Sequence, residues 1–467
     1  MPTSLHSLIL SRIDRLSESQ KSMVKVASVI GRLFRAAWLW GVYPELGEPN
    51  RIKADLDVLS RLDLTPLDTP EPELSYLFKH VITQEVAYES LPYATRAILH
   101  DQLGWFIERA YSDSIEQFID LLAFHFERSH NEAKKREYLR KAGEMAQANY
   151  ANEAAISYYE RLLSLLSEPE QVTVMLKLSE VLQLVGQWSE AGDLLQRSLL
   201  LAEQLGDQSA KAWCQTQTGE LFRKQGLYAE ATAWFERAKA RFEELGNQEG
   251  VAQVLHFNGH LADGQGDYEA ARALYEASLV IRRELGDKTR IASLLSNLGL
   301  VAHHQGDFES ARRLYEESLD LRYELKDKWA IGVSLNNLGY LNFDLGDYEA
   351  AGTQLEVAIG LQREVGDRLM MAIALNNLGN VARAQHNYAE ARRLYEESLT
   401  INKELGDREG IAYLLQDIGG LAACKANPSV PCVCLAQLKN CASRLEHPFL
   451  QPNWLALKKH LKQRVKI

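Results

Sequence analysis

Apolar residues recur three or four positions apart in the stretches 291–305 and 308–319. This spacing places the apolar side chains on one face of a helix and predicts a helix in each stretch. Between the two stretches, Gly306 is suited to end the first helix and Asp307 to cap the second. Glycine and aspartate follow each other again at residues 286–287 and 406–407. The pattern therefore predicts helical hairpins that succeed one another within two residues.

The hairpin pattern has a period of about 40 residues, within the range typical of repeat proteins. Each period contains a glycine, in most periods followed by an alanine at the twelfth position after it and by an aromatic residue or leucine at the sixteenth. The glycines are Gly219, Gly259, Gly299, Gly339, Gly379 and Gly419, the alanines are Ala231, Ala271, Ala311, Ala351 and Ala391, and the large residues are Phe235, Tyr275, Tyr315, Leu355 and Tyr395. Two further copies lie upstream, around Gly143 and Ser179. Because one pair of helices cannot bury its apolar faces, we expect the hairpins to stack into a superhelix with a concave groove.

The spacing of glycine, alanine and large residue resembles that of tetratricopeptide repeats, with the usual period of about 34 residues extended to about 40. The resemblance implies a mainly α-helical protein, a solenoid of about seven hairpins over residues 137–424. After it, residues 425–467 are expected to form a C-terminal capping region. Trp454, Leu457 and Leu461 form an apolar stripe there beside lysines and arginines. Such a basic amphipathic segment suits a cap, and it can also lie on an anionic membrane.

Residues 1–111 lack the repeat and predict helices that flank a short pair of strands. The helices are expected at 17–30, 52–62, 81–91 and 94–111, and the strands at 64–67 and 74–78. The first of these helices opens with a capping sequence from Ser17 to Gln20. This order is typical of a winged-helix domain over residues 1–111. In residues 112–136, the spacing of Phe118, Leu122 and Phe126 predicts a connecting helix.

Composition and charge reduce the number of functional classes to consider. The 467 residues are 46% hydrophobic, which excludes wholesale disorder, and no apolar run reaches the roughly 20 residues that span a bilayer. We therefore expect a cytoplasmic protein without stable membrane insertion. A net charge of −11 argues against nonspecific nucleic-acid binding, which depends on lysine and arginine.

Four of the five cysteines fall within one short segment, at Cys424, Cys432, Cys434 and Cys441. Thiolates so close in sequence can bind zinc or copper(I), but paired Cys-x-x-Cys motifs are absent. Neighbouring alanine, valine and leucine residues favour apolar packing of reduced cysteines over a metal site.

Three segments of the N-terminal region resemble the winged-helix end of STAND-class signal-transduction NTPases. They are Ser4–Leu16, Val26–Phe34 and Phe78–Tyr88. The nearest resemblance is to predicted AAA-type ATPases associated with bacterial adenylate/guanylate cyclase domains, in which a P-loop module, a winged helix and tetratricopeptide repeats follow in order. In that class a histidine at the start of the last winged-helix segment contacts the phosphates of bound ADP. His80 matches it, although Val81 follows where the family has aspartate.

The nucleotide-binding motif itself is missing from this chain. A P-loop needs a glycine-rich turn that ends in Gly-Lys, and the sequence contains no Gly-Lys dipeptide. The resemblance implies an ATPase module encoded upstream, and without that module His80 is better explained by packing between domains. Serine-hydrolase, zinc-protease and dinucleotide motifs are also absent, so we expect no enzymatic activity, no cofactor and no metal.

Three functions follow as hypotheses. The leading one is a protein-interaction module, the sensor or scaffold part of a STAND-like signalling regulator that binds a peptide or protein segment in the groove. The second is a DNA-binding regulator whose recognition helix is Arg51–Leu62, although Asp55 and Asp57 give that helix a mixed charge. The third is a regulatory subunit of a separately encoded ATPase.

The repeats themselves suggest the residues of a groove. The segments 335–339 and 375–379, both Leu-Asn-Asn-Leu-Gly, resemble repeats of the kinesin light chain type, in which polar residues of the first helix hold a peptide backbone. The corresponding residues, three positions before each glycine, are Thr216, His256, Ser296, Asn336 and Asn376. Arg223, His303 and Arg383, four positions after the glycine, are expected on the same surface and would favour acidic segments. Asn337 and Asn377 are expected to bond between helices instead.

Overall fold

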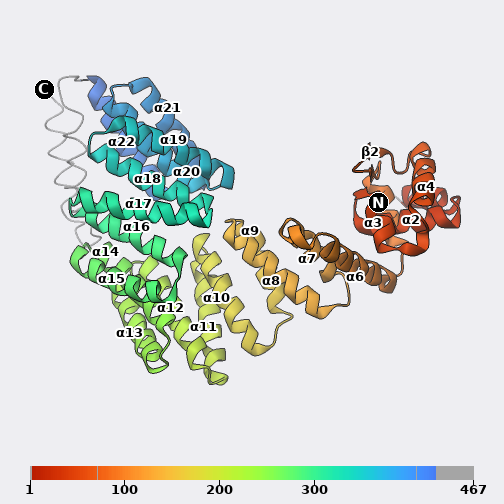
Figure 1. Cartoon of the computed structure of the whole chain (residues 1–467), viewed down its shortest axis with the longest axis horizontal. Helices are drawn as coiled ribbons and strands as arrows, with labels where there is room; N and C mark the ends of the chain where they lie inside the picture. The colour runs from red at the N-terminus through yellow and green to blue at the C-terminus, as the bar shows by residue number, and fades with distance from the viewer. Residues whose placement is uncertain (1–2, 71, 406, 427–467) are drawn as a thin grey trace. The chain divides into compact units, whose positions relative to one another are not determined.

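The computed structural model describes residues 3–70, 72–405 and 407–426 (Figure 1). The chain forms two compact units, Met1–Leu221 and Phe222–Ile467. Helices dominate both units, as the periodicity predicts, and the strands of the described residues all lie in the first unit.

The first unit begins with helices around a small antiparallel sheet of order β1-β3-β2. Phe34 of β1 pairs with Tyr76 of β3, and Leu67 of β2 pairs with the same Tyr76 from the other side. The elements are α1 Thr3–Asp14, α2 Glu18–Ile30, β1 Leu33–Arg35, α3 Ala36–Val42, the short 3₁₀ helix η1 Pro44–Leu46, α4 Pro49–Arg61, β2 Leu67–Thr69, β3 Ser75–Leu77 and α5 Val81–Glu89.

The capping sequence before α2 is confirmed. The backbone amide of Gln20 donates to Ser17 Oγ, and the Ser17 amide donates to Gln20 Oε1, so both members of a capping box are present. Apolar residues of α2 enter the core that also holds Phe34, Tyr76 and Phe78. The boundaries of α4 and α5 lie within three residues of the predicted ones.

Four elements of this region were not predicted, namely α1, β1, α3 and η1. Strand β1 has three residues, of which only Phe34 is buried, so it is too short to produce a periodic signal. Its pairing with β3 completes the sheet through a contact with a strand that is distant in sequence. Local pattern carries no information about such a contact.

The first unit continues with further helices, and from α6 to α11 each α-helix packs against the next α-helix in the chain. They are α6 Tyr93–Ala110, the 3₁₀ helix η2 Ser112–Phe118, α7 Ile119–Glu127, α8 Glu132–Ala148, α9 Asn152–Leu163, α10 Glu168–Leu184, α11 Trp188–Gln204 and α12 Gln208–Lys224. The helix expected within 112–136 is the short α7. The predicted domain boundaries at residues 111 and 136 stay predictions.

A pair of histidines is buried between α6 and α7. His100 Nδ1 and His125 Nδ1 are 2.8 Å apart and share a hydrogen bond, and His100 Nε2 bonds the Tyr88 hydroxyl at 3.0 Å. Burial lowers the pKa of His100 to about 4 and the pKa of His125 well below its usual value, and Arg128 adds to both effects. The pair is therefore neutral in the folded chain at pH 7.

The second unit consists of regular hairpins whose helices are nearly equal in length. After the end of α12 they are α13 Tyr228–Glu244, α14 Gln248–Gly264, α15 Tyr268–Leu285, α16 Lys288–His304, α17 Phe308–Leu325, α18 Lys328–Asp344, α19 Tyr348–Val365, α20 Arg368–Ala384, α21 Tyr388–Leu405 and α22 Arg408–Ala426. In every hairpin the even-numbered helix comes first. The tetratricopeptide-like solenoid expected from the period is thus confirmed.

Most turns of this unit have the same construction, whether they lie within a hairpin or between two hairpins. A residue with left-handed backbone ends one helix, and an aspartate or asparagine caps the next, as Gly306 and Asp307 do. The Asp307 carboxylate accepts a hydrogen bond from the Ser310 amide at 3.1 Å. The two turns of a repeat therefore use the same chemistry.

The two helices of a hairpin approach closely at the repeat glycine. A Cβ atom on Gly299 would lie 2.7 Å from Tyr315 Cδ1, and one on Gly379 would lie 2.5 Å from Tyr395 Cε1. Both tyrosine rings are fully buried. The ring thus lies where a side chain of the first helix would otherwise stand.

The first helices of the hairpins line the concave side of the second unit. Helices α16, α18, α20 and α22 contact one another in succession, whereas the second helices of the same hairpins approach each other less closely. In a curved stack, the elements on the inside of the curve lie closest together. We call the exposed face of α14, α16, α18, α20 and α22 the inner surface.

The buried pair of His100 and His125 predicts a loss of stability in mild acid. Unfolded histidine titrates near pH 6.5, so the unfolded chain binds more protons than the folded one as the pH falls from about 6.5 toward 4. Stability that is present above pH 6.5 should decline by roughly 2 kcal/mol per histidine by pH 5. The decline in stability can be measured by hydrogen exchange of the α6 and α7 amides at pH 7 and pH 5.

The control for this prediction is His125→Asn, which keeps a polar group beside His100 but removes one titrating side chain. After correction for the intrinsic pH dependence of exchange, α6 and α7 of this variant should lose less protection between pH 7 and pH 5. Equal losses in both proteins would contradict the role of the pair.

The left-handed turn at Lys326, where φ is 56°, provides a second test. A side chain in this conformation costs roughly 1 to 2 kcal/mol relative to glycine. Lys326→Gly should therefore raise the stability of the second unit by about 1 kcal/mol, measured as the shift of its calorimetric transition. The reverse change, Gly346→Lys at φ of 81°, should lower it by a similar amount. Shifts of the same sign in both variants would contradict this account.

Replacement of a repeat glycine should destabilise the array. Gly299→Ala forces its methyl group against the Tyr315 ring and is expected to cost about 1 to 3 kcal/mol, measured by urea unfolding. Gly360→Ala is the control, because Gly360 lies in the exposed face of α19 with open space around it. That change should stabilise α19 by about 0.5 to 1 kcal/mol. Equal effects of the two substitutions would refute the packing argument.

Candidate functional site

A row of hydrogen bonds joins the first helices along the inner surface. In each bond, the residue three positions before one repeat glycine accepts from an asparagine two positions before the next glycine. The pairs are Asn297 Nδ2 to His256 Nε2 at 2.8 Å, Asn337 Nδ2 to Ser296 Oγ at 3.3 Å and Asn377 Nδ2 to Asn336 Oδ1 at 2.9 Å. The expected bonding of Asn337 and Asn377 between helices is therefore confirmed.

His256 accepts in this row because it is neutral. Burial lowers its pKa well below the usual value, and the neighbouring His260 adds to the effect. The two imidazole rings are 4.6 Å apart, and His260 Nδ1 bonds the Tyr275 hydroxyl at 3.0 Å. The inner surface at α14 is thus a polar region with several hydrogen-bonding groups.

The row ends at Asn376. The residue that corresponds to Asn377 on the next helix is Asp417, whose carboxylate has no N–H to donate. Asn376 Oδ1 is buried and lacks a hydrogen-bond partner among the described residues. Because an unpaired buried carbonyl costs about 1 to 3 kcal/mol, this atom is a candidate acceptor for a bound ligand.

Asn336 keeps its amide hydrogens available for a ligand. Its Oδ1 is used by Asn377, but no bond of Nδ2 occurs in the part of the chain that the structure describes. Asn336 and Asn376 are both partly exposed. One asparagine therefore offers a donor and the other an acceptor, at equivalent positions of adjacent first helices.

Each positive residue expected on this surface has an acidic neighbour. His303 Nε2 donates to Asp344 Oδ2 at 2.9 Å, and an Arg383 guanidinium nitrogen lies 3.9 Å from Asp417 Oδ1. Burial raises the pKa of Asp263, and His304 and Arg223 partly offset this rise. Because His303 and Arg383 are buried and have acidic partners, they do not give the surface the expected preference for acidic segments.

Thr216 has a different environment. It belongs to the first unit, is completely buried and donates from its hydroxyl to the Ala212 carbonyl at 2.9 Å. It therefore does not reach the surface.

The inner surface becomes apolar toward α22. Large apolar side chains are exposed there on the same helix face as the asparagines. One of them follows a repeat glycine directly, and the others precede a repeat glycine by six or ten positions. They are Tyr340, Leu369, Ile373 and Tyr413, each 39% to 51% exposed. Sequence reasoning missed these residues because it searched for hydrogen-bonding side chains. The signal that could have identified them is that all three offsets from the glycines fall on the helix face of the asparagines.

His80 lies in the first unit, exposed, at the residue before the first turn of α5. Its side chain does not cap the helix, and the adjacent Lys79 forms an ion pair with Asp63. Its predicted contact with a nucleotide stays a prediction. Of the clustered cysteines, Cys432, Cys434 and Cys441 lie outside the described residues, as does the segment 452–467.

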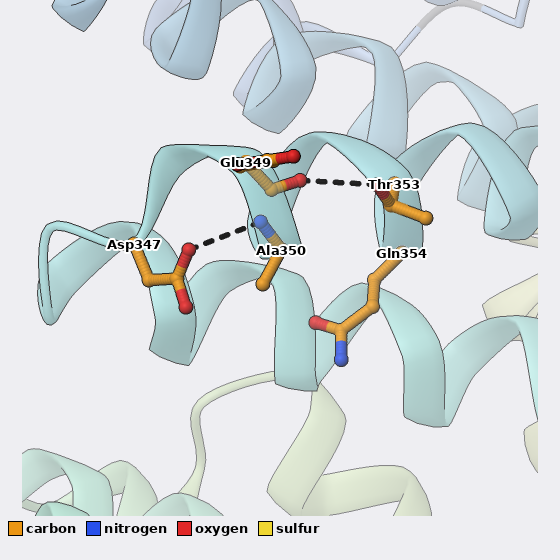
Figure 2. Close-up of a pocket in the computed structure, with 5 residues that line it drawn as sticks. All are labelled: Asp347, Glu349, Ala350, Thr353 and Gln354. Atoms are coloured by element: carbon orange, nitrogen blue, oxygen red, sulfur yellow. Dashed lines mark hydrogen bonds between the residues drawn. The ribbon is translucent and has the colours of Figure 1, made fainter.

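A surface hollow of about 420 Å³ lies at the start of α19 (Figure 2). Three of its side chains already have partners within the protein. The Asp347 carboxylate accepts from the Ala350 amide, Thr353 donates to the Glu349 carbonyl, and Gln354 Oε1 accepts from Asn342. This hollow lies at the ordinary cap of a helix, and we assign no ligand to it.

Comparison with protein families identifies the class of the chain. Residues 170–244, 250–324, 330–404 and 370–427 match the tetratricopeptide repeat family. The matched segments cover more than half of the 467 residues, so the chain belongs to this family.

Two solved structures have a similar fold. A signal transduction ATPase with numerous domains (STAND) from Pyrococcus horikoshii, which has a tetratricopeptide repeat sensor, is 15% identical with a TM-score of 0.56, over 99% of this chain and 68% of that chain. The Rap protein complexed with competence and sporulation factor is 15% identical with a TM-score of 0.51, over 70% of this chain and 93% of that chain.

At these identities the similarity is one of fold alone. None of the curated proteins compared with the sequence matches it. In the described part of the chain, no helix has the length and apolar character needed to cross a membrane.

Proposed function

We propose that the protein is a non-catalytic interaction module, the sensor or scaffold part of a signalling regulator, and that it binds an extended peptide or protein segment on the inner surface of its second unit. The observation that carries the proposal is the unpaired acceptor of Asn376 beside the available donor of Asn336. An extended peptide backbone presents one N–H and one C=O per residue and so complements this pair.

The fold relatives support a binding role. The Rap protein structure holds its competence and sporulation factor, and the P. horikoshii protein has its repeats as a sensor. Repeat solenoids in general use extended concave surfaces for binding. Binding rather than catalysis is also what the side-chain chemistry favours, since the titratable residues of the inner surface pair with one another across adjacent helices.

A second candidate function is that of a regulatory subunit for an ATPase module. The structural similarity to the STAND protein favours it, since that similarity covers 99% of this chain and 68% of the STAND protein. In this proposal residues 1–111 act as a winged-helix domain and His80 faces the nucleotide-binding module. A recognition role of α4 toward DNA is less favoured. Asp57 is exposed on that helix, and Asp55 holds Ser19 and Gln20.

Substitution of both asparagines tests the binding site. A partner is first obtained by pull-down with the full chain and identified by mass spectrometry. Asn336→Ala with Asn376→Ala should then weaken its binding by about 1 to 3 kcal/mol in calorimetric titration, because two hydrogen bonds are lost. Helicity by circular dichroism should not change.

Asn258→Ala is the matched control, since Asn258 lies on the first helix α14 one position before the repeat glycine and outside the row of bonds. It should leave affinity unchanged. If the double variant binds as tightly as the control, the inner surface is not the binding site.

A further inference from the structure

The inner surface has an apolar half, made of exposed side chains on its last three helices. Tyr340 of α18, Leu369 and Ile373 of α20 and Tyr413 of α22 are each at least 39% exposed. At α14 and α16 five of the six corresponding positions carry polar side chains, Leu300 being the exception; the polar ones are Glu249, Gln253, His260, Thr289 and Ser293. A ligand that covers α18 to α22 must therefore bring apolar side chains.

The chain itself continues directly from this half. Helix α22 ends at Ala426, and residues 427–467 follow in the sequence. In that segment, Trp454, Leu457, Leu461 and Val465 recur at the spacing of one helix face. An apolar helix face of this kind could cover the exposed apolar side chains of the inner surface.

The charges of the two parts are opposite. Residues 427–467 contain seven lysines and arginines and one acidic residue, whereas residues 222–426 contain 23 basic and 31 acidic residues. On the inner surface, Asp344 lies one turn beyond Tyr340 and is exposed. The negative charge of this unit therefore attracts a basic segment, and the Asp344 carboxylate can pair with a lysine or arginine beside the apolar residues.

We propose that residues 452–467 bind the apolar half of the inner surface of their own chain and thereby compete with external ligands. The proposal uses the surface assigned above but requires no external partner. The linking residues 427–451 span up to about 80 Å when extended, so length does not restrict this contact. A tether of this kind gives an effective concentration in the millimolar range, which favours closure even for a weak contact.

The competing position for the same segment is the end face of the array. Leu415 is 56% exposed on α22, whereas its counterparts Leu375 and Leu335 are 2% and 7% exposed. Among the side chains that the structure describes, this face exposes Ala412 and Leu415, whereas the inner surface exposes four large apolar ones, so we assign the segment to the inner surface. The two binding positions can be told apart on α22, because Tyr413 lies on the inner surface and Leu415 on the end face.

Photochemical cross-linking of the full chain separates them. The residue p-benzoylphenylalanine is placed at Tyr413, on the inner surface, or at Leu415, on the end face. We expect cross-links from position 413 to residues 452–467, identified by mass spectrometry, and none from position 415. The reverse result assigns the segment to a cap and overturns the proposal. Mixed light and heavy isotope-labelled chains tell intramolecular links from links to a second copy, and the latter also overturn it.

A binding measurement provides the independent readout. A fluorescent synthetic peptide of residues 452–467 should bind a chain that ends at residue 451 at least ten-fold more tightly than it binds the full chain. Ile373→Gln in the shortened chain should weaken this binding at least ten-fold, and Leu415→Gln should not. Equal binding to both chains, or binding only to anionic lipid vesicles, overturns the proposal. None of these outcomes depends on whether an external partner uses Asn336 and Asn376.

Discussion

The array depends on the contact between a repeat glycine of the first helix and a large side chain of the second. At Gly259, Gly299 and Gly379 a tyrosine ring fills the space of the missing side chain. At Gly339 the partner is Leu355, which is smaller but just as close. Because each ring is also buried, the contact sets both the distance between the two helices and the packing of the hairpin core. In the first unit, Gly143 against Tyr159 and Gly104 against Phe126 repeat it.

The contact between α6 and α7 explains one difference between the sequence pattern and the structure. Phe126 stands farther from Gly104 along the chain than the large residues of the repeats stand from their glycines. The 3₁₀ helix η2 lengthens the connection, so the same packing occurs outside the phase of the repeat. Periodicity identifies contacts that recur at a fixed separation, and for that reason it predicted the hairpins after residue 137 well. It does not detect the same contact at another spacing, nor the pairing of β1 with β3.

The helix positions of the proposed site residues could be predicted from the sequence, but their hydrogen-bond partners could not. The offset from the glycines gave His256, Ser296 and Asn336 equivalent places on successive first helices, since helical geometry is local, although His256 and Ser296 are buried there. It could not reveal that Asn377 uses the Asn336 oxygen, or that Asp344 and Asp417 lie beside the expected cations, because those partners lie on neighbouring helices. Whether a polar residue is available to a ligand depends on such neighbours.

The likeness of the two turns in a repeat also affects how such a chain can change in length. A left-handed residue and a capping aspartate occur at both turns. Unequal recombination between two equivalent turns therefore joins two segments that have the same kind of turn. A duplication or deletion of one whole repeat then creates no new kind of junction, and the contact between the repeat glycine and the large side chain of the second helix is kept. The inner surface can therefore grow or shrink by whole helices in a single genetic event, and its reach toward a partner can evolve separately from the side chains that line it.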